Sequence, residues 1–133
     1  MGKSGLIALL LAALCGPAVA GASVQRLSCT RLSGGPMRAF NVVINDTEKT
    51  LSLEPDTWWL SPDRMPDVPP AFEGDTIKWS YMRGVAVLDR KTGILDWDDT
   101  DEYAYLENIG QADPADKEEN YRGKMQCKIL EGH

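Results

Sequence analysis

The sequence predicts an all-β fold, a small antiparallel barrel of about seven or eight strands with one disulfide. Apolar and polar residues alternate in short segments along the chain, which is typical of strands with one buried face. Turn-forming residues separate these segments. Two cysteines stand near the two ends of the expected domain, where a bridge would join its first and last strands. A barrel is favoured on this ground, and a sandwich is the alternative.

Each predicted strand carries apolar residues at every second position. Phe40, Val42 and Ile44, for example, share one face. A turn at 89–93 joins two later strands as a hairpin, and Gly93 suits the positive φ that such a turn requires. The predicted strands are residues 25–32, 38–44, 50–53, 75–81, 85–88, 94–97, 102–106 and 124–130.

Two regions lack the strand pattern. Residues 54–71 contain prolines throughout, and proline cannot donate to a sheet. We therefore expect a long loop or irregular edge segment there, which carries Trp58 and Trp59. Residues 113–119 place Pro114 where a helix could begin, but they lack an apolar stripe and are expected to form a surface turn.

The N-terminal residues have the pattern of a cleavable secretion signal. Lys3 precedes an apolar run at 6–14, which is too short to stay in a membrane as an anchor. Gly16 and Pro17 break the run, and small residues follow where a signal peptidase cuts. We expect a signal peptide at residues 1–20, with 22 as its alternative end, and a single β-rich domain at 21–133.

Removal of the signal would leave an acidic domain. Lys3 is one of 14 basic residues, so 13 would face 20 acidic ones. Such a surface repels nucleic-acid phosphate and anionic lipid, and the sequence shows no basic stripe to bind them. We therefore expect no nucleic-acid partner and no membrane insertion after cleavage. A cationic envelope or secreted protein is the partner that the charge favours.

The signal would also remove Cys15 and leave Cys29 and Cys127. In an oxidising compartment two remaining cysteines normally form a disulfide. The bridge would join positions 98 apart. Closing a loop of that size contributes on the order of 4–5 kcal/mol in the chain-entropy description. An intermolecular bridge and two free thiols are the alternatives.

The acidic run at 96–102 is the most conspicuous polar feature. Asp98, Asp99 and Asp101 are its candidate binding residues. Calcium prefers clustered oxygen ligands, which this run offers at alternate positions. The calcium-loop pattern needs a glycine where this chain has Asp101. We therefore expect a solvated turn between strands, with no metal.

Trp58 and Trp59 are the second candidate surface. Paired tryptophans are large amphipathic groups, which could form an aromatic platform for a sugar or a peptide. The alternative is that one caps an end of the barrel and the other covers a loop.

Catalytic and cofactor motifs are missing from the sequence. The only histidine is His133, the last residue, so no Ser/His/Asp or Cys/His set can be built around a placed histidine. Neither a glycine-rich phosphate loop nor a zinc-ligand spacing is present. We therefore expect a protein that is not an enzyme and that holds no cofactor.

Several short motifs occur in a characteristic order. The alternating strand that begins at Phe40 is followed by Ile77-x-Trp79, by a hairpin at 88–95, and by a glycine shortly before Cys127. In this order the chain resembles the small, uncharacterised exported β-proteins of proteobacteria, in which a D-R-x-T-G-x-L hairpin precedes a closing G-x-C. The resemblance implies a disulfide-containing periplasmic β-protein and brings no established activity. The chain departs from the closing motif, because three residues separate its glycine from the cysteine.

A second resemblance rests on residues 81–84. This Tyr-Met-Arg-Gly sequence is similar to the aromatic-x-x-Gly segment of C-type lysozyme inhibitors, which are periplasmic barrels of similar size. Their Ser-Gly-x-x-Tyr inhibitory loop is missing, since the Ser-Gly-Gly-Pro at 33–36 has no tyrosine in place. The resemblance implies a lipocalin-like or lysozyme-inhibitor-like barrel and transfers no inhibitory residue.

These patterns favour a non-enzymatic binding or interaction module in the periplasm or in the secreted space. Its candidate surface is the loop with Trp58 and Trp59 beside the acidic run. The alternative function is an inhibitor of a cationic hydrolase such as lysozyme. A third is a small-molecule carrier with its ligand inside the barrel.

Overall fold

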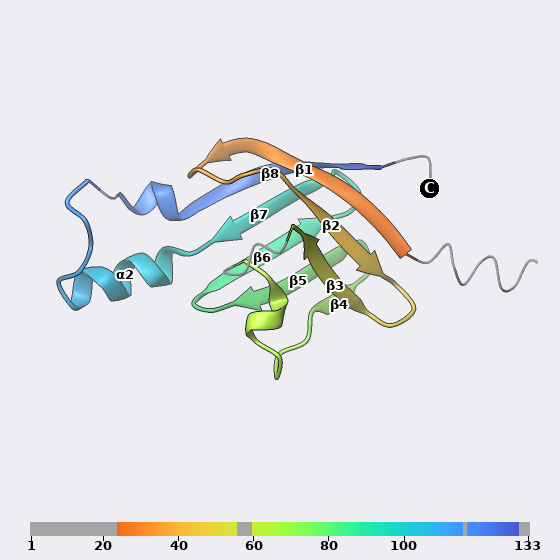
Figure 1. Cartoon of the computed structure of the whole chain (residues 1–133), viewed down its shortest axis with the longest axis horizontal. Coiled ribbons are helices and arrows are strands. Elements are labelled where there is room, and N and C mark those ends of the chain that lie inside the picture. The colour runs from red at the N-terminus through yellow and green to blue at the C-terminus, as the bar shows by residue number, and fades with distance from the viewer. Residues whose placement is uncertain (1–23, 56–59, 116, 131–133) are drawn as a thin grey trace, which may run out of the picture.

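The computed structural model describes residues 24–55, 60–115 and 117–130, which form one curled antiparallel sheet with a short helix at one end (Figure 1). The predicted signal peptide, Trp58, Trp59 and His133 lie outside these residues. The strands are β1 (Val24–Gly34), β2 (Phe40–Asn45), β3 (Thr50–Glu54), β4 (Ala71–Glu73), β5 (Thr76–Tyr81), β6 (Gly84–Asp89), β7 (Ile94–Asp98) and β8 (Arg122–Ile129). The helices are α2 (Thr100–Asn108) and the 3-10 turns η1 (Pro62–Arg64) and η2 (Glu118–Tyr121).

The sheet consists of two meanders that share a central seam. Its strand order is β3-β2-β1-β8-β7-β6-β5-β4, so the first and last strands are neighbours in the middle. Cys29 and Cys127 face each other directly across this seam and form the predicted disulfide. The all-β class, the strand number and the bridge are therefore confirmed.

The sheet curls as a half-barrel in which β3 and β4 are the edge strands. The disulfide thus joins the two meanders at the centre rather than at a closing seam. Lys49, which precedes β3, lies over the ring of Phe72 in β4 at 5.3 Å from its centroid. The two edges therefore approach each other, and η1 contacts strands on both sides.

The core lies inside the curl, where the alternating residues predicted to share a face are buried. Phe40, Val42 and Ile44 point inward from β2, as the period of two requires. Trp79 is buried as well, and its Nε1 donates a hydrogen bond of 2.8 Å to the carbonyl oxygen of Leu60. Because Leu60 and Ser61 are fully buried, the segment from Leu60 to η1 packs against the core.

The predicted hairpin between β6 and β7 is present. Ile94 pairs with Asp89, and Gly93 adopts a φ of 78°, which a residue with a Cβ rarely tolerates. The side chain of Asp89 accepts hydrogen bonds from the backbone N–H groups of Lys91 and Thr92. Turn chemistry within five residues was therefore sufficient to predict this hairpin.

The predicted strand at 102–106 is wrong, because these residues belong to α2. Tyr103 and Tyr105 produce the alternation of a strand, but local contacts favour a helix. The side chain of Asp98 accepts hydrogen bonds from both the backbone N–H and the hydroxyl of Thr100, which turns the chain at the end of β7. Carboxylates in the first turn then interact favourably with the amino end of the helix.

The expected solvated turn at 96–102 is also corrected. Its first residues continue β7 to Asp98, and the rest start α2. The loop expected at 54–71 contains η1 and leads into β4, a three-residue strand that the sequence pattern missed. Of the surface turn expected at 113–119, residues 114 and 115 form a turn, whereas 118 and 119 begin η2.

Candidate functional site

Five carboxylates follow one another closely in the sequence, and we call them the acidic end: Asp96, Asp98, Asp99, Asp101 and Glu102. The first two point outward from β7, because its alternate residues Leu95 and Trp97 are buried in the core. The other three follow at the start of α2. The structure therefore brings the predicted residues Asp98, Asp99 and Asp101 together at one end of the half-barrel.

Asp99 is the N-cap residue of α2 and is partly buried. Its backbone N–H donates a 2.6 Å hydrogen bond to the carbonyl oxygen of Tyr121, which links the start of α2 to the end of η2. Partial burial raises the pKa of Asp99 to about 6, and the negative charges of Glu102, Asp98 and Asp101 add to this effect. Asp99 therefore gains a proton in mildly acidic solution, well before an ordinary aspartate does.

Asp98 behaves in the opposite way. The hydrogen bond from the hydroxyl of Thr100 lowers the pKa of Asp98, and the nearby charge of Arg122 acts in the same direction. The pKa values of these two neighbouring aspartates are thus shifted in opposite directions. Asp98 accepts hydrogen bonds as an anion, whereas Asp99 is partly removed from water. Asp98 carries a stable negative charge at neutral pH.

Arg83 braces α2 from the turn between β5 and β6. Its Nε lies 2.9 Å from Oε2 of Glu102, and its guanidinium carbon lies 3.7 Å from the ring centroid of Tyr105. Cation–π stacking and ion pairing thus fix one side of the helix. On another side Tyr103 packs against Tyr121 with ring centroids 5.1 Å apart.

Despite these contacts, five of the nine residues of α2 are exposed and the other four are only partly buried. None of its residues is buried, and Figure 1 shows it projecting beyond the end of the sheet. Tyr105 is 41% exposed, and Ile109, one turn later on the same side, is 43% exposed. Met82, next to Arg83, is 52% exposed. The apolar patch, defined as Met82, Tyr105 and Ile109, therefore accompanies the acidic end.

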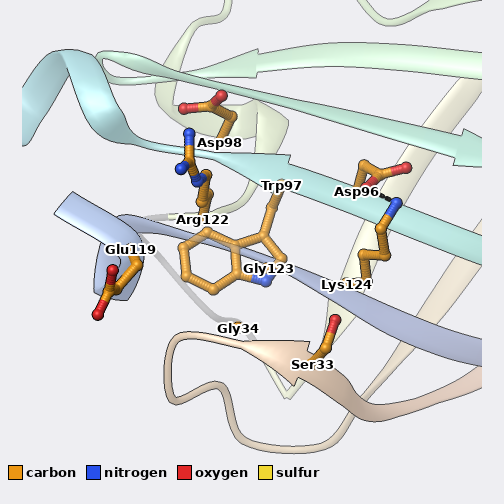
Figure 2. A pocket seen from close by; sticks show the side chains of 9 residues that line it. All are labelled: Ser33, Gly34, Asp96, Trp97, Asp98, Glu119, Arg122, Gly123 and Lys124. Atoms are coloured by element: carbon orange, nitrogen blue, oxygen red, sulfur yellow. Dashed lines mark hydrogen bonds and ion pairs between the residues drawn. The ribbon is translucent and has the colours of Figure 1, made fainter.

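Two shallow pockets flank the outward row of Asp96 and Asp98. One, of about 340 Å³, lies over β6 and is lined further by Arg83, Val85, Val87, Thr100 and Asp101. The other, of about 350 Å³, lies on the side of β8 and includes Glu119, Arg122 and Lys124 (Figure 2). Both pockets combine carboxylates with cations.

The pocket in Figure 2 is shaped by cross-strand pairs. Lys124 faces Asp96 in the register, and their side chains form an ion pair of 2.7 Å. Between the charged positions, Gly123 faces Trp97. A Cβ on Gly123 would lie 2.7 Å from the carbonyl oxygen of Ser33 and 3.0 Å from Nε1 of Trp97. The neighbouring atoms therefore leave room only for glycine at position 123. The main chain of Gly123 forms part of the pocket wall.

The arrangement suits protein or ligand binding better than metal coordination. Within residues 24–55, 60–115 and 117–130, no three potential acidic, histidine or cysteine ligands lie close enough to hold a metal ion. The contribution of Arg83 and Tyr105 was not predicted, since their contact depends on the packing of a helix where a strand was expected.

Comparison with known proteins identifies no relative, because no family model, no curated protein and no solved structure matches this chain. Among the described residues, no helix is sufficiently long and apolar to span a membrane.

Proposed function

We propose that this chain is a non-enzymatic binding module of the periplasm or the secreted space. It uses the acidic end and the apolar patch to hold a cationic surface of an envelope or secreted protein. The observation that carries the proposal is the exposure of α2, which projects from the sheet without burying a residue. A helix that adds nothing to the core requires another reason for its position.

The composition of this surface supports protein binding. Aromatic and methionine side chains are enriched in protein interfaces, and Tyr105 and Met82 are both exposed here. Charged residues around such a centre set the approach and the choice of partner. The five carboxylates of the acidic end outnumber the neighbouring cations Arg83, Arg122 and Lys124, and this excess of negative charge favours a cationic partner.

The proposed location rests on two independent features. The N-terminal sequence has the pattern of an export signal. The disulfide between Cys29 and Cys127 is a bond of the kind that persists in oxidising compartments.

The test is affinity capture from a periplasmic extract of the source organism, with matched charge variants. The first variant carries Asp98→Asn, Asp101→Asn and Glu107→Gln around α2. Asparagine keeps an oxygen that can accept the bonds from Thr100. The control carries Glu48→Gln, Asp67→Asn and Glu73→Gln, which change three exposed carboxylates away from α2.

We expect the wild type and the control to capture the same cationic protein and the α2 variant to retain less than a tenth of it. Capture should also fall steeply as salt is raised, because exposed charges are screened. Equal capture by both variants would contradict the proposal, and so would a captured partner with an acidic surface.

An inhibitor of a cationic hydrolase is the second candidate. The observation in its favour is the two-residue turn at 82–83, which carries exposed side chains beside α2 and could enter a cleft. Lysozyme activity should then fall in the presence of micromolar protein, and Met82→Ala should relieve the effect. Full lysozyme activity at that concentration would remove this candidate.

The carrier hypothesis has less support. Large side chains such as Trp79, Tyr81 and Leu88 are fully buried inside the curl. They occupy the space that a ligand inside the half-barrel would need.

A further inference from the structure

The opposite end of the half-barrel carries a pocket of a different character. It lies where the β6–β7 turn meets the start of β1 and the end of β8, and its volume is about 660 Å³. We call it the basic pocket. Its polar and apolar lining includes Arg90, Lys91, Thr92, Gln126, Lys128 and Ile129.

The charge of the basic pocket contrasts with that of the whole chain. Three cations line it against the single carboxylate of Asp75, whereas the protein has a net charge of −6. Both pockets at the acidic end have more lining carboxylates than cations. A local excess of positive charge on an acidic protein concentrates anions at that place.

One of the three cations has a structural role. The guanidinium of Arg90 donates to both carboxylate oxygens of Asp46, at 2.7 and 2.9 Å, and to Oε1 of Gln25 at 3.0 Å. This clasp joins the β6–β7 turn to β1 and to the β2–β3 turn. Arg90 is therefore largely neutralised and shapes the pocket wall.

The other two cations are available. Lys91 and Lys128 are exposed, and neither forms an ion pair with any of the residues that the structure describes. Between them the backbone is held firmly, since the N–H of Cys127 donates a 2.7 Å hydrogen bond to the carbonyl oxygen of Gly93. The amide of Gln126 also donates to the carbonyl oxygen of Thr92.

We infer that the basic pocket binds a phosphate group, through the ammonium groups of Lys91 and Lys128. A phosphate offers several acceptor oxygens and can use both ammonium groups at once. Lys91 comes from a turn fixed to β8 and Lys128 from β8 itself, so the two stems start from one rigid framework. Ile129, which is 60% exposed at the rim, would contact the organic part of a phosphate ester.

The phosphate could belong to a soluble ester or to the headgroup of an anionic lipid. Both present the same chemistry to the two lysines. The experiment therefore has one arm for each source, and it uses inorganic phosphate and lipid vesicles as the probes.

The first arm is a titration of the purified exported protein with inorganic phosphate, followed by backbone amide NMR at pH 7 and low salt. We expect saturable shifts at 91–93 and 126–129. The variant with Lys91→Gln and Lys128→Gln should bind at least fivefold more weakly. The control with Lys78→Gln and Lys117→Gln changes two exposed lysines elsewhere by the same charge and should bind as the wild type does.

The second arm measures co-sedimentation with phosphatidylglycerol and phosphatidylcholine vesicles. Preference for phosphatidylglycerol that the Lys91/Lys128 variant loses would assign the site to a lipid headgroup. Saturable phosphate binding without that preference would assign it to a soluble ester. The inference is overturned if neither probe binds, or if the control variant loses as much binding as the site variant.

Discussion

At the end of the half-barrel where β6 turns into β7, Arg90 connects three segments through paired hydrogen bonds, and its partner Asp46 is 44 residues away. At the other end, α2 is held by Arg83, by the Tyr103–Tyr121 pair and by the backbone hydrogen bond from Asp99, and none of its residues is buried. The same strands thus end in a clasp on one side and in an exposed helix on the other.

The two ends differ in how their charged side chains are arranged. At the clasp, opposite charges meet at short distance, and the pKa of Asp46 is held below its usual range by the hydrogen bonds from Arg90. At the acidic end, partial burial raises the pKa of Asp99, and the neighbouring carboxylates add to this effect. Stability alone would not favour the second arrangement. We therefore assign stability to the clasp end and partner binding to the acidic end.

The largest effect is expected from loss of the disulfide at the seam between β1 and β8. Replacing both cysteines, Cys29→Ala with Cys127→Ala, should lower the free energy of unfolding by about 4–5 kcal/mol, because the unfolded chain regains the entropy of a large loop. Urea denaturation followed by tryptophan fluorescence measures it. A loss below 1 kcal/mol would show that the sheet does not depend on the bridge.

We expect the next largest effect at Gly123, whose main chain lines a pocket at the acidic end. Gly123→Ala should lower the free energy of unfolding by about 2–3 kcal/mol, since its Cβ would overlap the carbonyl of Ser33 and crowd Trp97. Gly110→Ala is the control, because no atom lies within 4 Å of the added Cβ there. Its cost, from the positive φ alone, should be about 1 kcal/mol. Equal losses in thermal or urea denaturation would argue against the close approach.

The clasp gives a smaller effect. Arg90→Ala should cost about 1–2 kcal/mol, because the charge-assisted hydrogen bonds are partly exposed. Arg83→Ala, which removes the brace of α2, should cost less than 1 kcal/mol. Denaturation of both variants at neutral pH compares the two ends directly, and a larger loss for Arg83→Ala would reverse the assignment.

A further small effect is the pH dependence that Asp99 introduces. Its pKa of about 6 in the folded state lies above the value near 3.9 of an unfolded chain, so the folded state binds the proton more tightly. The contribution of Asp99 to stability therefore falls as pH rises from about 4 to 6. Asp99→Asn should remove this decline and stabilise the protein by on the order of 1 kcal/mol at pH 7. Denaturation curves between pH 4 and 8 would contradict the account if the decline were unchanged.

The sequence was informative where a local pattern decides the structure. Strands with one buried face reveal themselves by alternation, as Phe40, Val42 and Ile44 do, and the β6–β7 turn by its glycine. The helix α2 was missed because Tyr103 and Tyr105 mimic that alternation, while an Asx turn at Asp98 decides the outcome.

The candidate site was predictable only in part. Asp98, Asp99 and Asp101 are neighbours in sequence, so their clustering follows from the chain itself. The brace of Arg83 on Tyr105 joins residues from a hairpin and a helix, and the clasp of Arg90 on Asp46 joins two distant turns. Contacts of this kind depend on the topology of the sheet, which alternation does not specify.

Hydrogen exchange of the protein alone and bound to the captured partner tests the central claim most directly. In the free protein, the amides of α2 should exchange much faster than those of β1 and β8, because the helix has no buried side chain. On binding, we predict added protection at 82–83 and 100–109 and no change at 89–93. Protection confined to 89–93 and 126–129, with α2 unaffected, would contradict the assignment of partner binding to the acidic end.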